Sequence, residues 1–203
     1  MSLAKYRKKR NFRVSPEPRG SKSGKGKSSL LYVIQKHRAS RLHYDFRLEW
    51  KGVLLSWAIP KGPSLDPSVK RLAMRVEDHP VEYGGFEGMI PAGEYGGGTV
   101  MLWDRGTWSP EVADVDAALS KGDLKLTLHG KKLCGSWALV RTRGYGGSGK
   151  TSWLLIKHRD AFASTKDITL QKPRSVLTRR LLAGIARDEG GDVATAASGD
   201  PQA

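Results

Sequence analysis

The sequence has a single cysteine, Cys134, among its 203 residues. One cysteine cannot form an internal disulfide, and it excludes a zinc site built from several cysteines. No apolar run approaches the ~20 residues that a membrane-spanning helix requires. The basic segment 1–10 continues into further charged residues, so we expect no secretory signal there. These absences favour a protein of a reducing compartment, with the cytoplasm as its expected location.

Acidic residues are few compared with basic ones. Asp and Glu number 20 and Lys and Arg number 35, which gives a net charge of +15 and a pI near 10.1. Residues 1–28 hold ten of the basic residues and one acid, Glu17. This distribution favours a polyanionic partner, nucleic acid before an anionic membrane, and so a nucleoid-associated protein. We expect a basic arm along phosphates; a leader that only aids solubility is the alternative.

Helix signals are also scarce, the clearest being at 112–120 after Ser109 and Pro110. A parallel α/β fold needs a helix after most strands and is therefore excluded. We expect a mainly β protein, a compact antiparallel β-barrel with one or two short helices and flexible N- and C-terminal tails. Its strands are predicted where short apolar segments lie between Gly- and Pro-containing turns, at 30–36, 42–50, 53–59, 71–77, 98–104, 124–128, 133–141 and 153–158.

Three regions are expected along the chain. Residues 1–29 would form the basic arm and a linker rich in Gly, Ser and Lys. Residues 30–165 would form the barrel domain. Residues 166–203 lose the strand pattern and end in small, polar residues, so we expect a largely disordered tail.

The expected strand at 42–50 carries the polar residues His43, Asp45 and Arg47 on one face, because side chains alternate along a strand. His43 and Asp45 would lie about 7 Å apart at Cα, close enough to share a metal ion. His37, at the end of the preceding strand, is a third candidate ligand. This set suits a catalytic Mn²⁺, Zn²⁺ or Fe²⁺, with Arg47 gripping an oxyanion beside it. A solvated strand face is the alternative.

A second polar cluster, His79 and Tyr83, precedes a segment with many glycines at 84–98. Glycines let the backbone approach a ligand closely. Both side chains are predicted to donate to phosphate oxygens, or His79 to act as general acid for a leaving alkoxide. The alternative is that His79 hydrogen-bonds within a turn and Tyr83 packs.

Residues 144–151 match the phosphate-binding pattern G-x-x-x-x-G-K-[ST]. That loop needs a helix at its end, whereas residues 152–156 indicate a strand. We therefore expect a hairpin loop there and no site for a nucleoside triphosphate.

Taken in order, these motifs resemble the phosphoesterase domain of bacterial ligase D, a family that serves DNA repair by non-homologous end joining. The resemblance covers about residues 5–165. It rests on the segments His37-x5-His43-Tyr-Asp45-Phe-Arg47-Leu, Ser56-Trp-Ala-Ile-Pro-Lys61-Gly-Pro, Val76-Glu-Asp-His79-Pro with Tyr83, Phe86-Glu-Gly-x-Ile-Pro-x-Gly-Glu-Tyr95-Gly, Trp103-Asp-Arg-Gly-Thr-Trp108 and Trp153-Leu-Leu-Ile-Lys-His-Arg-Asp160.

The resemblance implies a metal-dependent 3′-end-healing enzyme. It would trim a 3′-terminal ribonucleotide to a 3′-phosphate, as a phosphodiesterase, and then remove that phosphate, as a phosphomonoesterase. It implies DNA primer-template 3′ ends as substrate and Mn²⁺ as the preferred ion, with Zn²⁺ or Co²⁺ as other candidates. The sequence contains no Lys-x-Asp-Gly motif, and its 203 residues leave no room for ligase or polymerase modules. We therefore expect a free-standing protein that meets a ligase, a polymerase or the Ku protein in trans. The runner-up is a non-catalytic nucleic-acid-binding barrel.

Position by position, the resemblance implies that the metal ligands are His37, His43 and Asp45, and that the scissile phosphate contacts Arg47, His79 and Tyr83. It implies further substrate contacts by Arg10, Lys61 and Arg71, and supporting roles for Asn11, Glu17 and Glu77. The family's N-terminal segment Arg-Asp-Phe-x-x-Thr-x-Glu-Pro is here Arg10-Asn11-Phe12-Arg-Val-Ser15-Pro-Glu17-Pro18. The acidic residue of that segment is therefore replaced by Asn11, which removes a charge.

Overall fold

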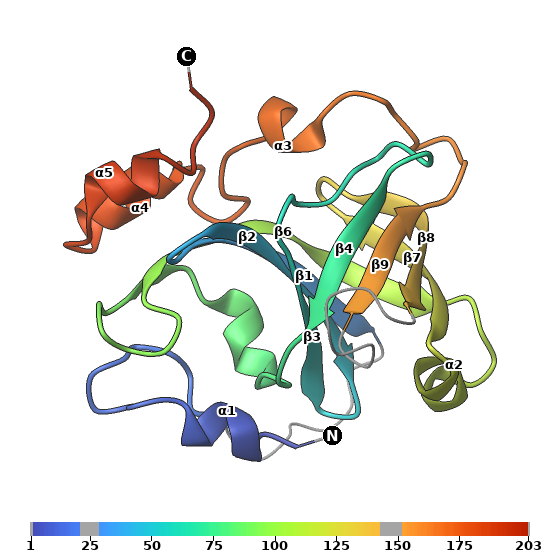
Figure 1. Cartoon of the computed structure of the whole chain (residues 1–203), viewed down its shortest axis with the longest axis horizontal. Coiled ribbons are helices and arrows are strands. Elements are labelled where there is room, and N and C mark those ends of the chain that lie inside the picture. Colours follow the sequence, from blue (N-terminus) through green and yellow to red (C-terminus); the bar gives the residue numbers. More distant parts are fainter. Residues whose placement is uncertain (1, 21–28, 143–151, 203) are drawn as a thin grey trace.

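The computed structural model describes residues 2–20, 29–142 and 152–202. Within them, nine strands form one antiparallel sheet of order β1-β2-β3-β4-β9-β8-β7-β6-β5 (Figure 1). Strand β6 also pairs with β1, which closes an eight-stranded barrel, and β5 extends the sheet beyond β6. The prediction of a mainly β antiparallel barrel is confirmed. The strands are β1 (Leu30–Arg38), β2 (Leu42–Trp50), β3 (Val53–Ile59), β4 (Lys70–Arg75), β5 (Gly88–Ile90), β6 (Gly98–Pro110), β7 (Asp123–Gly130), β8 (Cys134–Arg141) and β9 (Ser152–Lys157).

The hairpin between β2 and β3 shows how the sequence sets the register. Its two-residue turn, Lys51-Gly52, has positive φ angles of 49° and 78°, as in the turns that match the twist of antiparallel strands. This turn pairs Trp50 with Val53 and, further along, Arg47 with Ser56. Because side chains alternate, Arg47 then faces away from the barrel interior.

Large side chains fill the inside of the barrel, so it is a packed core without a channel. Trp57, Trp103 and Trp137 come from three different strands and are fully buried. Burial of an aromatic side chain of this kind contributes about 1.5–3 kcal/mol. The interior therefore supplies a rigid scaffold for residues on the outer face.

A second, smaller apolar cluster lies on the outer face of β1 and β3. Its buried members are Tyr6, Leu54 and Tyr83. Tyr6 belongs to helix α1 (Ala4–Lys8) and Tyr83 to the 3₁₀ helix η1 (Val81–Gly85). Figure 1 shows both helices beneath the arch that β1 and β2 form. The cluster thus fixes two distant segments over the polar face of these strands.

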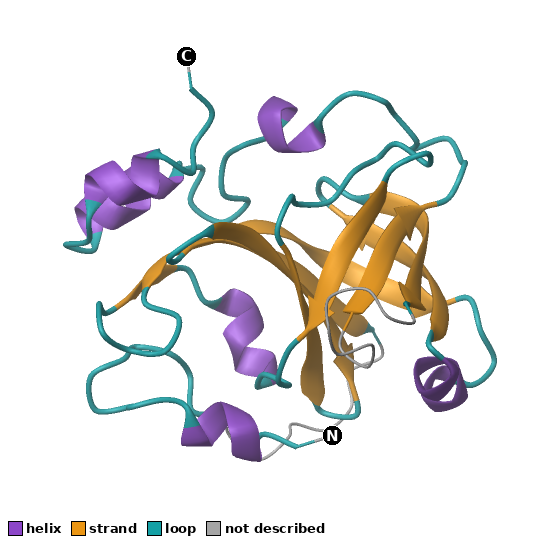
Figure 2. Ribbon diagram, viewed as in Figure 1, coloured by secondary structure: helices purple, strands orange, loops and turns teal. Residues whose placement is uncertain are grey.

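The expectation of a largely disordered tail at 166–203 is wrong for the described residues up to 202. They hold α3 (Ile168–Gln171), α4 (Leu182–Asp188) and α5 (Val193–Ala197), seen in Figure 2 as helices beside the sheet. Apolar side chains of α4 and α5 join the main core. Small residues such as alanine give only a weak hydrophobic pattern in the sequence, but they let helices pack closely.

The described residues also contain more helices than the one or two that the sequence predicts. Helix α2 (Val115–Lys121) begins after Asp114, whose side chain accepts a hydrogen bond from Ala117 N at 3.0 Å. Ser109 and Pro110, the predicted start, still belong to β6 because they pair with β7. None of the helices in the described part of the chain is long and apolar enough to cross a membrane.

The N-terminal segment (residues 2–20) differs from the predicted flexible arm, because it packs against the barrel through Tyr6. The predicted linker falls mainly at 21–28, which lies outside the described residues. The segment 144–151, with its phosphate-loop pattern, lies outside them as well.

A buried lysine ends β9. The side chain of Lys157 is 0% exposed and donates to the carbonyls of Ser136, at 3.1 Å, and His158, at 3.2 Å. It also pairs with the carboxylate of Asp160. Burial opposes ionisation of this carboxylate, but Lys157 and the backbone N–H groups of Ser136 and Phe162 hold the pKa of Asp160 below its ordinary value.

We expect Asp160→Asn to lower the free energy of unfolding at pH 7 by about 2–3 kcal/mol, because a buried ammonium loses its counter-charge. The lowered pKa means that this contribution is complete above the ordinary Asp pKa of 3.8 and disappears as the pH falls through the folded value. Urea unfolding of both proteins at pH 7 and near pH 2.5 measures it. A difference of the same size at both pH values would contradict the assignment.

Candidate metal centre

His37, His43 and Asp45, here called the metal-ligand triad, meet at the end of the β1–β2 hairpin. His37 on β1 is paired with His43 on β2, and their ring centroids lie 4.8 Å apart. Asp45 Oδ2 is 3.8 Å from His37 Nδ1 and 3.7 Å from His43 Nε2. One ligand atom from each residue lies within 4.8 Å of the others. The structure therefore brings together the three ligands that the sequence predicts.

The hydrogen bonding of the two imidazoles fits a bound cation. His43 Nδ1 lies 3.0 Å from the carbonyl of Arg41, to which it donates, so the lone pair of Nε2 faces Asp45. His37 is buried, and its Nε2 has no hydrogen-bond partner in the part of the chain that the structure describes. A buried polar atom without a partner is costly, and a ligand would remove that cost. Two imidazoles and a carboxylate are donors that suit a divalent transition metal with open positions.

Arg47, on the same face as Asp45, is held by three partners. Its Nε donates to Gln35 Oε1 at 2.8 Å, Nη1 to Ser56 Oγ at 2.8 Å, and Nη2 lies 3.1 Å from Asp45 Oδ2. Gln35 in turn donates to the carbonyl of Tyr83 at 3.0 Å. A guanidinium has five N–H donors in a rigid fork, so two remain for a ligand beside the triad.

Gln35 and Ser56 are site residues that sequence reasoning missed. The signal was present in the strand alternation, since Gln35 lies two residues before His37 and Ser56 is paired with Arg47. Both are fully buried. Their role is to fix the guanidinium in one orientation.

The charges of this centre are set by Arg47. Burial opposes ionisation of Asp45, but Arg47 and the two imidazoles hold the pKa of its carboxyl well below the ordinary value. Burial also opposes protonation of His43, but the nearby carboxylate of Asp45 raises the pKa of that imidazole. The carboxylate is therefore ionised and available as a ligand at neutral pH.

His79 lies beside this network and is 4% exposed. Its Nδ1 donates to the carbonyl of Glu77 at 2.9 Å, and its Nε2 accepts from Arg10 Nη2 at 3.2 Å. Burial and the cations Arg47 and Arg10 hold the pKa of His79 well below its ordinary value. The imidazole is therefore neutral, and a role as general acid requires that Nε2 first take up a proton.

Tyr83 lies between the neutral imidazole of His79, whose ring it meets edge-on, and the guanidinium of Arg47. Its ring centroid lies 4.8 Å from that of His79, and the guanidinium carbon of Arg47 is 4.9 Å from it. Burial raises the pKa of Tyr83 well above its ordinary value. The hydroxyl thus keeps its proton and can act as a donor.

Arg10 joins the N-terminal segment to the same face. Its Nε donates to Glu17 Oε1 at 2.8 Å, and its Nη1 lies 3.3 Å from Glu77 Oε1. Ser15 Oγ donates to the other oxygen of Glu17 at 2.8 Å. Both Arg10 and Glu17 have side chains less than a tenth exposed. The predicted residues Arg10, Glu17 and Glu77 therefore form one buried network that contacts His79.

Asn11 does not enter this network. Its side chain is exposed, and its Oδ1 accepts a hydrogen bond from Arg13 N at 3.2 Å. Its backbone carbonyl accepts from Ser15 N at 2.9 Å. These contacts shape the turn that leads to Glu17, and an asparagine forms such a turn as well as an aspartate does.

Lys61 and Arg71 are the two predicted substrate contacts that the structure places elsewhere. They line a separate cavity of about 490 Å³, together with Lys70, Leu72 and Leu154 of β4 and β9. Their contact with a substrate remains a prediction.

Comparison with known proteins identifies related sequences. A family model described as the DNA Ligase D 3′-phosphoesterase domain matches residues 35–141. The multifunctional non-homologous end joining protein LigD of Pseudomonas aeruginosa is 52% identical over 184 residues, which are 89% of this chain and 22% of that protein. The corresponding DNA repair protein of Mycobacterium tuberculosis is 46% identical over 142 residues, 70% of this chain and 18% of that protein. The chain thus spans about a fifth of the length of these relatives.

We expect Asp45→Ala to abolish divalent-metal binding, since the triad loses its only anionic ligand. The Mn²⁺ affinity, measured by isothermal titration calorimetry, should fall by roughly 100-fold or more. Asp66→Ala is the matched control, because Asp66 lies in the loop between β3 and β4 and its hydrogen bonds within the described residues go to its near neighbours Ser64, Ser68 and Val69. Equal affinity in the Asp45 variant and the control would remove the triad as the metal site.

Proposed function

Because the chain belongs to the DNA ligase D 3′-phosphoesterase domain family, we propose that it heals DNA 3′ ends in non-homologous end joining. Membership makes it a hydrolase of phosphoester bonds. The proposed reactions are those of a 3′-ribonucleoside phosphodiesterase followed by a 3′-phosphomonoesterase. The proposed substrate is the 3′ end of a primer-template.

The observation that carries this proposal is the position of Arg47. Its guanidinium lies beside the metal-ligand triad, is 2% exposed, and keeps two N–H groups that no hydrogen bond or ion pair among the described residues uses. A buried cation next to a metal site matches a dianionic phosphate monoester or a monoanionic diester. Arg47 would bind two phosphate oxygens at once and stabilise the charge that builds on them.

The residues around the phosphate have separable tasks. A divalent ion held by the triad would polarise a phosphate oxygen. The Tyr83 hydroxyl, kept protonated by burial, would donate to another oxygen. A bound phosphate adds negative charge beside His79, which favours protonation of Nε2. His79 would then give up its hydrogen bond from Arg10 and donate its proton to the leaving oxygen.

We assign Mn²⁺ as the resident ion, with Zn²⁺ and Co²⁺ as the alternatives. Imidazole and carboxylate donors suit all three, but a phosphate oxygen in an open position adds a hard ligand that Mn²⁺ accepts readily. The preference among these three ions would therefore depend more on the ligands that complete the coordination than on the triad.

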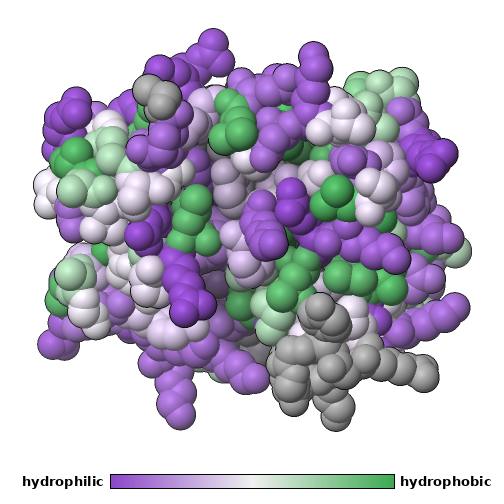
Figure 3. Space-filling view, turned by 45° about the horizontal axis from the view of Figure 1, so that its top comes forward, coloured by the Kyte–Doolittle hydropathy of each residue, from purple (hydrophilic) through white to green (hydrophobic). Residues whose placement is uncertain are grey.

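The proposed contact with DNA is supported by the charge of the chain. The net charge of +15 and the many hydrophilic side chains on the face drawn in Figure 3 favour contact with DNA phosphates. Exposed Lys5, Arg7 and Lys8 extend from α1 near the site. We propose cytoplasmic, nucleoid-associated action together with a ligase, a polymerase or the Ku protein.

The direct test uses a primer-template that ends in one 3′-ribonucleotide and a matched one that ends in a 3′-phosphate. With Mn²⁺ the first should lose its terminal nucleoside and both should end as 3′-hydroxyls on a sequencing gel, and chelator should stop each reaction. Arg47→Lys should retain metal binding but slow both reactions roughly 100-fold, because an ammonium lacks the planar fork. Binding of DNA with unchanged ends would instead indicate a non-catalytic binding module.

A second prediction concerns the N-terminal segment. Glu17→Gln should lower kcat/KM for both reactions by about tenfold or more, since Arg10 loses a buried counter-charge and with it its fixed position. Asn11→Asp should change kcat/KM less than about twofold, because Asn11 is exposed and already forms the turn. A large gain from Asn11→Asp would mean that the missing charge limits catalysis.

A further inference from the structure

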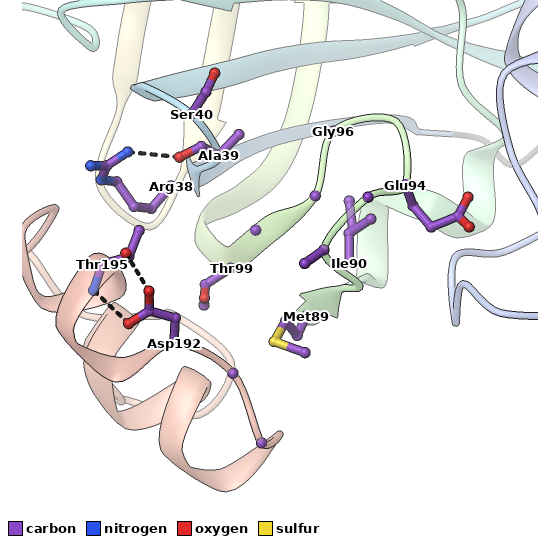
Figure 4. A pocket seen from close by; sticks show the side chains of 16 residues that line it. Arg38, Ala39, Ser40, Met89, Ile90, Glu94, Gly96, Thr99, Asp192 and Thr195 are labelled. Atoms are coloured by element: carbon purple, nitrogen blue, oxygen red, sulfur yellow. Dashed lines mark hydrogen bonds between the residues drawn. The ribbon is translucent and has the colours of Figure 1, made fainter.

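A cavity of about 610 Å³ lies at the turn end of the β1–β2 hairpin (Figure 4). Three segments line it: the turn at 38–40, the glycine-rich loop (residues 91–97) with the flanking ends of β5 and β6, and the segment 190–195, which connects α4 to α5 and includes the first turn of α5. The volume is in the range of pockets that bind small organic ligands.

The cavity adjoins the metal-ligand triad. Gly96 lines it, and a Cβ atom at Gly96 would lie 3.7 Å from Cε1 of His37. Arg38 and Thr99 also line it, and they are paired with each other on β1 and β6. Arg38 directly follows His37 in the chain. A molecule in the cavity would therefore be attached to, or next to, the phosphate at the triad.

The charge of the lining argues against a phosphate as the occupant. Its ionisable side chains are Arg38, Glu94 and Asp192. Arg38 is already engaged, because it donates to the carbonyl of Ala39 at 2.7 Å and to Ser198 Oγ at 2.9 Å. Two carboxylates beside one engaged guanidinium repel the polyanionic backbone that the rest of this +15 chain attracts.

The remaining lining suits an uncharged molecule with flat apolar faces and polar edges. Met89 and Ile90 offer apolar surface, and Thr99 and Thr195 add hydroxyl groups. Figure 4 shows these side chains around the hollow, with Thr195 bonded to Asp192 on its far side. A nucleoside has this character.

We propose that the cavity binds the 3′-terminal nucleoside that leaves when the phosphodiester is cleaved. This inference rests on the proposed function. In that step water adds its oxygen to phosphorus, the bond from phosphorus to the 5′-oxygen of the terminal nucleoside breaks, and that oxygen takes up a proton. The strand keeps the phosphate, and the released nucleoside is uncharged, as the lining requires.

The C-terminal wall of the cavity limits what can enter. The connection at 190–195 lies outside residues 35–141, which the family model matches. It is held close to the sheet, since a Cβ atom at Gly191 would lie 2.3 Å from Met89 Sδ. A wall in this place admits a single terminal nucleoside and stops a continuing strand.

A comparison of the two proposed reactions distinguishes nucleoside binding in the cavity from the chemical step at the phosphate, because dephosphorylation releases no nucleoside. Ala92 lines the cavity from an exposed position in the glycine-rich loop. Ala92→Trp should therefore lower the ratio of diester to monoester kcat/KM about tenfold or more. Ser40→Trp, in another lining segment and also exposed, should lower the same ratio. The diester substrate, which ends in a 3′-ribonucleotide, and the monoester substrate, which ends in a 3′-phosphate, are primer-templates of one sequence. Both are assayed with Mn²⁺.

Ala161→Trp is the matched control, since Ala161 is exposed in a turn after β9 and does not line the cavity. It should leave the ratio as in the parent protein, and thermal melting checks that all three variants fold. A parent-like ratio in both cavity variants, with folding intact, would overturn the pocket assignment alone. A parent protein that leaves both 3′ ends unchanged would overturn the proposed function, and the pocket assignment with it.

Discussion

The buried pair of Asp45 and Arg47 is the interaction on which the site depends. An ion pair inside a protein is stable only when the remaining donors and acceptors are also satisfied. Gln35 and Ser56 satisfy the guanidinium, and both occupy strand positions that the barrel register fixes. This arrangement keeps the carboxylate ionised for a metal and leaves two N–H groups for an anion.

A second layer of charge connects the N-terminal segment to this pair. Arg10 is buried between Glu17, Glu77 and His79, so the segment cannot move away without exposing or unpairing charges. Burial and the cations on either side of His79 lower its pKa and keep its imidazole neutral in the free protein. The proton of this histidine is thus linked to whether an anion is bound, which joins substrate binding to the chemistry.

Sequence reasoning was most accurate where the pattern is local. The strands β2 and β3 have the predicted bounds, since alternation and the Lys51-Gly52 turn specify them without help from the rest of the chain. Strand β5 escaped prediction because three residues carry no pattern. The helices α4 and α5 escaped because alanine and glycine become apolar contacts only when a surface is there to receive them.

The sequence by itself determined the barrel class and the polar face of β2 that carries His43, Asp45 and Arg47, since a period of two residues fixes which side chains share a face. Tertiary structure alone decided three other matters. It brought Arg10 of the N-terminal segment against His79, it placed Lys61 and Arg71 in another cavity, and it built a pocket wall from residues 190–195. Each of these depends on contacts between segments that are far apart in the chain. Local periodicity holds no information about such contacts.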